Sequence, residues 1–211
     1  MTIIHQDEHI VVVNKPSGFL SVPGRGAEKI DSVAHRISTT IPGCIAQPAV
    51  HRLDMDTSGL LVLALTKDAH RNLSKQFQDR LTDKEYFALL DGELPEKFGK
   101  SGTITLPFRL DIENRPYQIL DEIHGKMGTT HWKCLSIDDG ITRMHFKPVT
   151  GRTHQLRVHS AHPKGLGLPI VDDPLYGNGA DPGKMKLHAA KLSFDHPVSG
   201  ERLTFTTPTP F

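Results

Sequence analysis

The segment His51–Gly59, with the sequence His-Arg-Leu-Asp-Met-Asp-Thr-Ser-Gly, places a carboxylate and a guanidinium beside hydroxyl groups. Leu53 can anchor this segment in a core, and the short side chains after it suit a tight turn before the apolar run 60–65. Asp54 is therefore expected at the entrance of a strand, in a fixed position. An aspartate at such a turn can also simply cap its own backbone, so the rest of the chain must decide between the two interpretations.

A second polar constellation lies at Thr150–His159 (Thr-Gly-Arg-Thr-His-Gln-Leu-Arg-Val-His). Thr153 is suited to cap a helix, in which His154, Arg157 and Ala161 share one face because their spacings are three and four. We expect this helix to aim Arg157 from a rigid element.

Two other kinds of site are disfavoured by spacing. His154 and His159 are five residues apart, an awkward spacing for two ligands on one helix face, and no acidic residue nearby completes a hard-metal site. Asp54 and Asp56 would have to flank a sugar ring about 5–9.5 Å apart to act as a glycosidase pair, which residues two apart at one turn rarely do. The sequence therefore predicts neither a metal site nor a glycosidase carboxylate pair.

The composition is that of a globular protein. The 211 residues suit one catalytic unit, and 37% of them are apolar, which with 18 Gly approaches the usual content. The apolar runs are short and the N-terminus lacks a leader pattern, so no membrane span or export signal is expected. Cys44 and Cys134 lie far apart, which argues against a disulfide framework and favours the cytoplasm.

The net charge is only +1, but the charges are unevenly distributed. No Asp or Glu occurs between Ile141 and Val171. The cationic and histidine side chains of this basic stretch are Arg143, His145, Lys147, Arg152, His154, Arg157, His159, His162 and Lys164. Such a stretch can collect phosphates, or it can be a solvated face.

Hydrophobic periodicity and turn residues predict an α+β architecture with antiparallel pairing. Helices are expected over 32–40, with Asp31 or Ser32 as N-cap, and over 68–81. Strands are expected over 10–14, 60–65, 85–91, 103–106, 131–137, 142–148, 191–194 and 202–206. The segment 162–186 carries five Gly and four Pro, and a loop of that length is usually functional.

Six ordered segments resemble the motifs of the RluA-type pseudouridine synthases. They are Lys15–Gly18 (KPxG), His51–Gly59 (HRLDxxTSG), Lys84–Tyr86 (KxY), Gly151–His159 (GRxHQ[LI]RVH), Asp173–Gly177 (DxxYG) and Leu187–Ala189 (LHA). The resemblance covers nearly the whole chain. Asp172 stands where the family usually has Gly, and Leu168 where it more often has His.

The resemblance implies a pseudouridine synthase fold: a mixed, mainly antiparallel sheet in two lobes, with flanking helices and a central RNA-binding cleft. A single catalytic domain over 1–211 is expected. Only fourteen residues precede Lys15, so we expect no appended S4-like domain.

The implied reaction is isomerisation of a uridine within RNA, in which the N1–C1′ bond breaks and the base is rejoined through C5, without cofactor or metal. Asp54 matches the catalytic carboxylate, whether it attacks the sugar, attacks the base or removes a sugar proton. Arg157 matches the arginine that pairs with it. Tyr86 matches the tyrosine that packs on the uracil and assists removal of the C5 proton; a tyrosine at a strand start can also be a core residue.

The uridine must leave its stack to reach Asp54, and Arg52 matches the residue that occupies the vacated space. His51 is expected to position the turn. Further RNA contacts are expected from Lys15, Arg143, Lys147, Arg152 and His154.

The segments Ser21–Arg25 and Asn114–Pro116 resemble the RluA group proper, which modifies the first loop position of a tRNA anticodon arm and a hairpin of 23S rRNA. Another tRNA or rRNA uridine is the alternative. A non-catalytic RNA-binding module is disfavoured because Asp54, Tyr86 and Arg157 are all present. We expect a monomer whose partners are tRNA and 23S rRNA hairpin loops.

Overall fold

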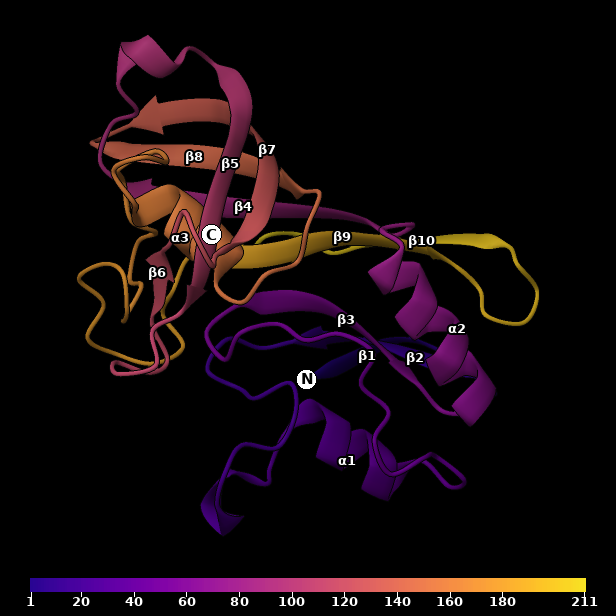
Figure 1. Ribbon diagram of the computed structural model, residues 1–211. Helices are drawn as coiled ribbons and strands as arrows, with labels where there is room; N and C mark the ends of the chain where they lie inside the picture. The colour runs from indigo at the N-terminus through magenta and orange to yellow at the C-terminus, as the bar shows by residue number, and fades with distance from the viewer. The chain divides into compact units, whose positions relative to one another are not determined.

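The computed structural model describes residues 1–211 and divides into two compact units (Figure 1). Unit 1 comprises Met1–Lys84 and His188–Pro210, and unit 2 comprises Glu85–Leu187 with Phe211. Helices and mainly antiparallel strands occur in the chain, which confirms the α+β class and the two lobes.

Unit 1 is built on a sheet with the strand order β1-β2-β3-β9, and β10 pairs with β9. Only the β3–β9 pairing is parallel. The strands are β1 (Thr2–Gln6), β2 (Ile10–Lys15), β3 (Ser58–Ala64), β9 (Leu187–Asp195) and β10 (Arg202–Thr206). The helical elements are η1 (Ala27–Lys29), α1 (Val33–Thr40) and α2 (Lys67–Gln78).

The core of unit 1 explains why its strands are almost entirely apolar. Every residue of β3 is buried, and so are Ile10–Val13 of β2; side chains pointing to both faces of the sheet are covered. Ala69 and Leu73 of α2 pack on one face. The hydroxyls of Ser32 and Thr66 accept main-chain N–H groups at the starts of α1 and α2, as helix caps do.

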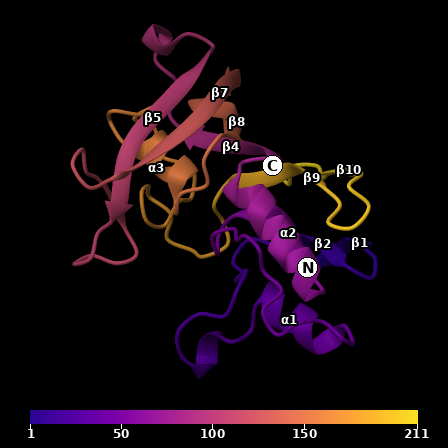
Figure 2. The same ribbon diagram turned by 45° about the vertical axis from the view of Figure 1, so that its right-hand side comes forward.

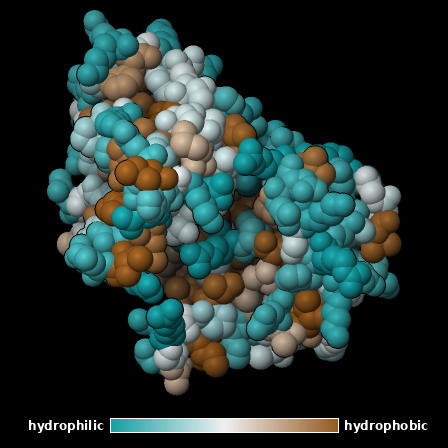
Figure 3. All heavy atoms as spheres, viewed as in Figure 1, coloured by the Kyte–Doolittle hydropathy of each residue, from teal (hydrophilic) through white to brown (hydrophobic).

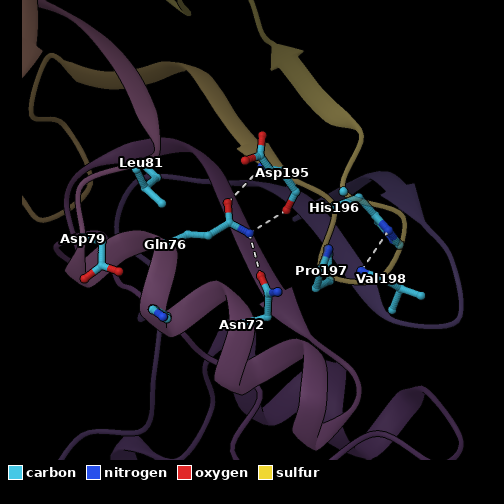
Figure 4. Close-up of a pocket in the computed structure, with 10 residues that line it drawn as sticks. Asn72, Gln76, Asp79, Leu81, Asp195, His196, Pro197 and Val198 are labelled. Atoms are coloured by element: carbon cyan, nitrogen blue, oxygen red, sulfur yellow. Dashed lines mark hydrogen bonds between the residues drawn. The ribbon is translucent and has the colours of Figure 1, made fainter.

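A buried glutamine fixes α2 to the end of β9. The Gln76 amide accepts from the N–H of Asp195 at 2.8 Å and donates to its carbonyl at 2.7 Å, and also donates to Asn72 Oδ1 (Figure 4). Asn72, Gln76 and Asp195 line a pocket of about 390 Å³ between α2 and the β9–β10 turn. Figure 2 shows α2 beside β9 and β10 from a second direction.

Unit 2 contains an antiparallel sheet with the strand order β4-β8-β7-β5-β6. The strands are β4 (Asp83–Asp91), β5 (Ser101–Leu110), β6 (Gln118–Leu120), β7 (Lys126–Asp138) and β8 (Ile141–Pro148). The helical elements are η2 (Glu96–Phe98) and α3 (Gln155–Ala161).

The two faces of this sheet differ. One face is apolar and packs against α3 and the segment 162–186 through side chains such as Phe146, Leu156 and Ile170. Successive side chains along each strand point alternately to this face and to the opposite one. The opposite face, here called the outer face, carries mostly polar side chains. Its members are Glu85, Phe87 and Leu89 of β4, Arg143, His145 and Lys147 of β8, Thr129, His131 and Lys133 of β7, and Ser101, Thr103 and Thr105 of β5.

Most predicted elements are present, with two kinds of difference. The helix predicted over 68–81 ends at Gln78, and Leu81 lies outside it with 53% of its surface exposed. The short strands β1 and β6 were not predicted. The segment 162–186 contains no helix or strand, as predicted.

No helix has the length and apolar character that crossing a membrane requires. The surface in view is largely hydrophilic, with hydrophobic residues scattered over it (Figure 3).

Candidate active site

The turn that carries Asp54 is tied to unit 1 through its main chain. Leu53 is buried, and its N–H and carbonyl both bond to the Ser21 hydroxyl, at 3.1 and 2.7 Å. The carbonyl of Asp54 accepts from the N–H of Thr57, and the carbonyl of Asp56 accepts from the Ser17 hydroxyl. The predicted tight turn with its leucine anchor is confirmed.

Lys15 binds the same turn through hydrogen bonds from its ammonium to main-chain carbonyls. Its ammonium is fully buried and donates to the carbonyls of Pro16, Phe19 and Met55 at 3.0, 2.7 and 2.8 Å. Burial lowers the pKa of Lys15 to about 8, although the carboxylates of Asp56 and Asp54 oppose this change. The prediction that Lys15 binds RNA is therefore wrong: its three donors are used inside the protein, where no phosphate reaches them.

His51 fixes the beginning of the turn, as expected. Its ring stacks on Phe77 with centroids 4.2 Å apart, and Nε2 accepts the N–H of Val62 at 3.1 Å. Burial, with a smaller effect of the nearby Lys84 charge, lowers the pKa of His51 to about 3. The imidazole is therefore neutral at physiological pH and acts as an acceptor.

The end of the turn is fixed where β3 meets β9. Ser58 Oγ lies 2.8 Å from Nδ1 of His188, and both side chains are buried. Gly59 has φ +115°, and a Cβ there would lie 2.3 Å from the carbonyl oxygen of Ala189. Only glycine fits this close approach, which explains the Ser-Gly pair in the motif.

These anchors leave Asp54 partly buried, while the neighbouring Arg52 and Met55 are exposed. A carboxylate on a rigid turn, flanked by an exposed guanidinium, suits a reaction in which an acidic group acts beside a phosphate backbone.

Tyr86 lies near the start of β4 in unit 2. Directly opposite it in the sheet is Phe146, and its ring packs against the apolar core beneath α3. The side chain is only partly buried; its packing agrees with the core role, and the ring contact with uracil stays a prediction.

The helix that carries Arg157 begins one residue later than predicted. His154, not Thr153, is the N-cap; it adopts a left-handed conformation (φ 54°) and makes no capping bond. The Gln155 side chain organises this end instead. Its Oε1 accepts from Thr150 Oγ1 and the N–H of Arg152, and its Nε2 donates to Thr129 and Thr130.

Arg157 makes a buried, bidentate ion pair with Asp173. Its Nε and Nη2 donate to the two carboxylate oxygens at 2.8 and 2.6 Å. The side chains are 3% and 0% exposed. Burial alone would raise the pKa of Asp173, but the Arg157 guanidinium and the N–H groups of Leu175 and Tyr176 outweigh it and hold this pKa below its usual value.

Two other predicted RNA-binding residues lie beside α3. Arg152 is exposed, and its Nε donates to the carbonyl of Met127 at 3.3 Å. His154 is partly buried, and its Nδ1 lies 2.9 Å from Tyr176 Oη. RNA contacts by both remain predictions.

Arg143 and Lys147 lie on the outer face of the unit 2 sheet, whereas Tyr86 lies on the apolar face. Lys147 forms a 3.2 Å ion pair with Glu85, and Arg143 donates to the carbonyl of Phe211 at 3.0 Å. These two cations therefore lie on the opposite face of the sheet from Tyr86, and the basic stretch is divided between two surfaces.

The two departures from the family pattern fit the local backbone. Asp172 has φ 58°, a left-handed conformation that glycine adopts without strain and that Asp tolerates better than most residues. Leu168 packs against the unit 2 core close to Gly92.

No group of three or more His, Cys, Asp or Glu side chains has a geometry that could hold a metal ion.

The structure places Asp54 and Arg52 on one turn of unit 1, and Tyr86 and Arg157 on the same side of the unit 2 sheet. Sequence reasoning missed the roles of Asp173, Tyr176 and His188. All three belong to motifs that were noticed, but nothing in their spacing indicates which distant residue each one contacts.

Comparison with known proteins identifies related chains. Residues 9–162 match the family model described as RNA pseudouridylate synthase. A protein of Haemophilus ducreyi named dual-specificity RNA pseudouridine synthase RluA is 46% identical over 212 residues, covering 99% of this chain and 93% of its own. The protein of the same name from Escherichia coli K12 is 42% identical over 215 residues, covering 100% and 94%.

Solved structures agree with this result. Human RNA pseudouridylate synthase domain containing 1 superimposes with a TM-score of 0.78 at 30% identity, covering 100% of this chain and 84% of its own. Human RNA pseudouridylate synthase domain containing 4, at 24% identity and a TM-score of 0.74, shows the same fold.

Proposed function

The chain belongs to the RNA pseudouridylate synthase family, and on that basis we propose that it isomerises uridines in both tRNA and 23S rRNA. It is an isomerase that acts on RNA. The observation that carries the dual substrate is the identity of 42–46% over nearly the full length to relatives named for dual specificity. The proposed targets are the first loop position of a tRNA anticodon arm and a hairpin loop of 23S rRNA.

In the proposed reaction Asp54 is the catalytic carboxylate. The N1–C1′ bond breaks, a C5–C1′ bond forms, C5 loses its proton and N1 gains one, so the product is an isomer of the substrate. The anchored turn supports this role because it fixes the main chain on both sides of Asp54.

Arg157 is proposed to pair with Asp54, and Tyr86 to pack on the uracil and assist removal of the C5 proton. Arg52 is proposed to fill the space left by the flipped base, where a guanidinium can both stack and bind phosphate. Its exposure next to Asp54 supports this assignment. We further propose that the protein acts as a monomer in the cytoplasm.

Mapping pseudouridines in total RNA from cells with and without this protein tests the substrates. We expect one site in an anticodon arm and one in a 23S rRNA hairpin to be lost, and both to return when the gene is restored. Loss confined to other RNA positions would contradict the proposed substrates while leaving the enzyme class intact.

A minimal anticodon stem-loop supplies the second test. If the catalytic domain recognises a short loop through its phosphates, this RNA should react nearly as well as whole tRNA. A stem-loop that stays unmodified while whole tRNA reacts would show that recognition needs a larger RNA surface.

A further inference from the structure

The Arg157–Asp173 pair is side-on and bidentate, and both side chains are buried. Asp173 takes the edge of the guanidinium that carries Nε and Nη2. Because a guanidinium is planar and its donors are fixed, its other edge, with Nη1, points away from Asp173. The direction of that second edge is therefore set by the position of one carboxylate.

Asp173 is itself held rigidly by its own turn. Its Oδ1 accepts the N–H groups of Leu175 and Tyr176 at 2.8 and 3.1 Å. Its carbonyl accepts from the N–H groups of Gly177 and Gly179. A Cβ at Gly179 would lie 2.3 Å from the carbonyl oxygen of Asp172, so the main chain is closely packed at this turn.

The same turn contacts Arg157 a second time through Tyr176. The guanidinium carbon lies 5.2 Å from the centroid of the Tyr176 ring, within the range of a cation–π contact. Tyr176 Oη accepts the N–H of Gln118 in β6 and lies 2.9 Å from His154 Nδ1. The ring is thus fixed to β6 and to the start of α3.

We infer that Asp173 is a positioning residue for the isomerisation: it orients Arg157, and the Tyr176 ring holds the guanidinium in that orientation. This inference rests on the proposed function, in which the second edge of Arg157 pairs with Asp54. Asp173 is fully buried and acts through the arginine, so replacing its carboxylate removes the group that sets the direction of the guanidinium. A displaced guanidinium then fails to stabilise the carboxylate in the transition state.

A double-mutant cycle on the single-turnover rate tests this directly. Asp173→Asn should slow the chemical step about ten- to a hundredfold while leaving RNA affinity within about twofold, because a small displacement at a reacting group has effects of that size. An Arg157→Lys variant has already lost the planar guanidinium that can pair with two carboxylates. In this background Asp173→Asn should slow the chemical step by less than about twofold.

Asp121 supplies a matched control in the same unit. It also accepts two N–H groups of its own turn, from Ile123 and His124, and also pairs with an arginine, Arg109. Asp121→Asn should lower the melting temperature and leave the single-turnover rate unchanged. If Asp173→Asn does not fold, Asp173→Glu, which keeps the charge but shifts the carboxylate, takes its place in the cycle.

Two results would overturn the inference: a rate for the Asp173 variant within about twofold of wild type, or equal slowing in the wild-type and Arg157→Lys backgrounds. The proposed function fails separately. Its substrates are rejected by pseudouridine mapping, and the role of Asp54 is rejected if Asp54→Asn keeps its activity in the same assay, whatever the Asp173 variants do.

Discussion

Lys15 shows how strongly a single side chain can constrain the catalytic turn. A buried ammonium that donates to three main-chain carbonyls crosslinks the residues after β2 to Met55, the neighbour of Asp54. The cost of burying this charge is visible in its pKa of about 8. The family's KPxG segment thus serves the turn through its lysine.

Replacing Lys15 by Met should therefore destabilise the protein and slow catalysis. The apolar side chain has a similar length but leaves three carbonyls without a donor, so we expect a loss on the order of 2–4 kcal/mol in the free energy of unfolding. Denaturant unfolding measures this loss, with Lys75→Met on the exposed side of α2 as the control.

The same variant also distinguishes the structural role from RNA binding. If Lys15 neutralised a phosphate, its replacement would reduce the slope of the salt dependence of RNA binding by nearly one unit. We expect no change in slope for Lys15→Met, and a reduced slope with unchanged stability would contradict the structural role.

At the scale of elements, the unit 2 sheet separates two sets of basic residues. Arg157 belongs to the helix on the apolar face, while Arg143 and Lys147 belong to the outer face. Hydroxyl groups of Thr103, Thr105 and Thr129 share that outer face, and cations beside hydroxyls suit phosphate contacts that position an RNA without specifying its sequence.

Neutralising the outer face should weaken RNA binding without changing the chemistry. For the double variant Arg143→Gln/Lys147→Gln we expect the slope of log K against log salt to fall by up to about 1.4–1.8. The single-turnover rate at saturating RNA should not change. Arg71→Gln/Lys75→Gln on α2 is the matched control.

An unchanged slope would mean that the outer face is only solvated, and a lower saturating rate would mean that it takes part in catalysis.

The elements were predictable where local chemistry decides them. Ser32 caps α1 as expected, and the strand 202–206 has the predicted bounds. The start of α3 was wrong because the Gln155 side chain, bonded to β7, replaces the expected threonine cap. β1 was missed because it lies largely exposed at the edge of its sheet, without a buried face to impose periodicity.

The site was predictable only in part. The tight turn around Asp54 and its leucine anchor could be predicted from residue types and spacing, whereas the catalytic role of Asp54 follows only from the resemblance to the family and stays a prediction. The Arg157–Asp173 pair spans sixteen residues and the Ser58–His188 pair 130, and such pairings depend on the tertiary fold. Lys15 was misjudged because lysines are almost never fully buried unless paired.

At the scale of the whole molecule, two buried histidines predict sensitivity to acid. His159 and His188 have Nε2 atoms that are buried without a partner, and burial lowers the pKa of each to about 4. In the unfolded chain these imidazoles have the ordinary histidine pKa of about 6.5. Between these two pKa values the unfolded chain holds more protons.

Stability should therefore fall as the pH falls from about 6.5 to about 4, and each histidine contributes about 1.4 kcal/mol per pH unit within that window. Urea unfolding near pH 7 and near pH 5 measures the slope. His159→Gln/His188→Gln should reduce it, while the exposed control His124→Gln should not. An identical slope in the double variant would contradict the buried, neutral state of these imidazoles.

The central claim, that Asp54 performs the isomerisation, is tested most directly by tritium release from RNA labelled at uridine C5. Asn keeps the shape of the side chain but not its charge, so Asp54→Asn should release no tritium above background while RNA affinity stays within a few fold and the melting temperature is unchanged. The exposed Asp68→Asn variant is the control. Release by folded Asp54→Asn at a rate near that of wild type would contradict the assignment.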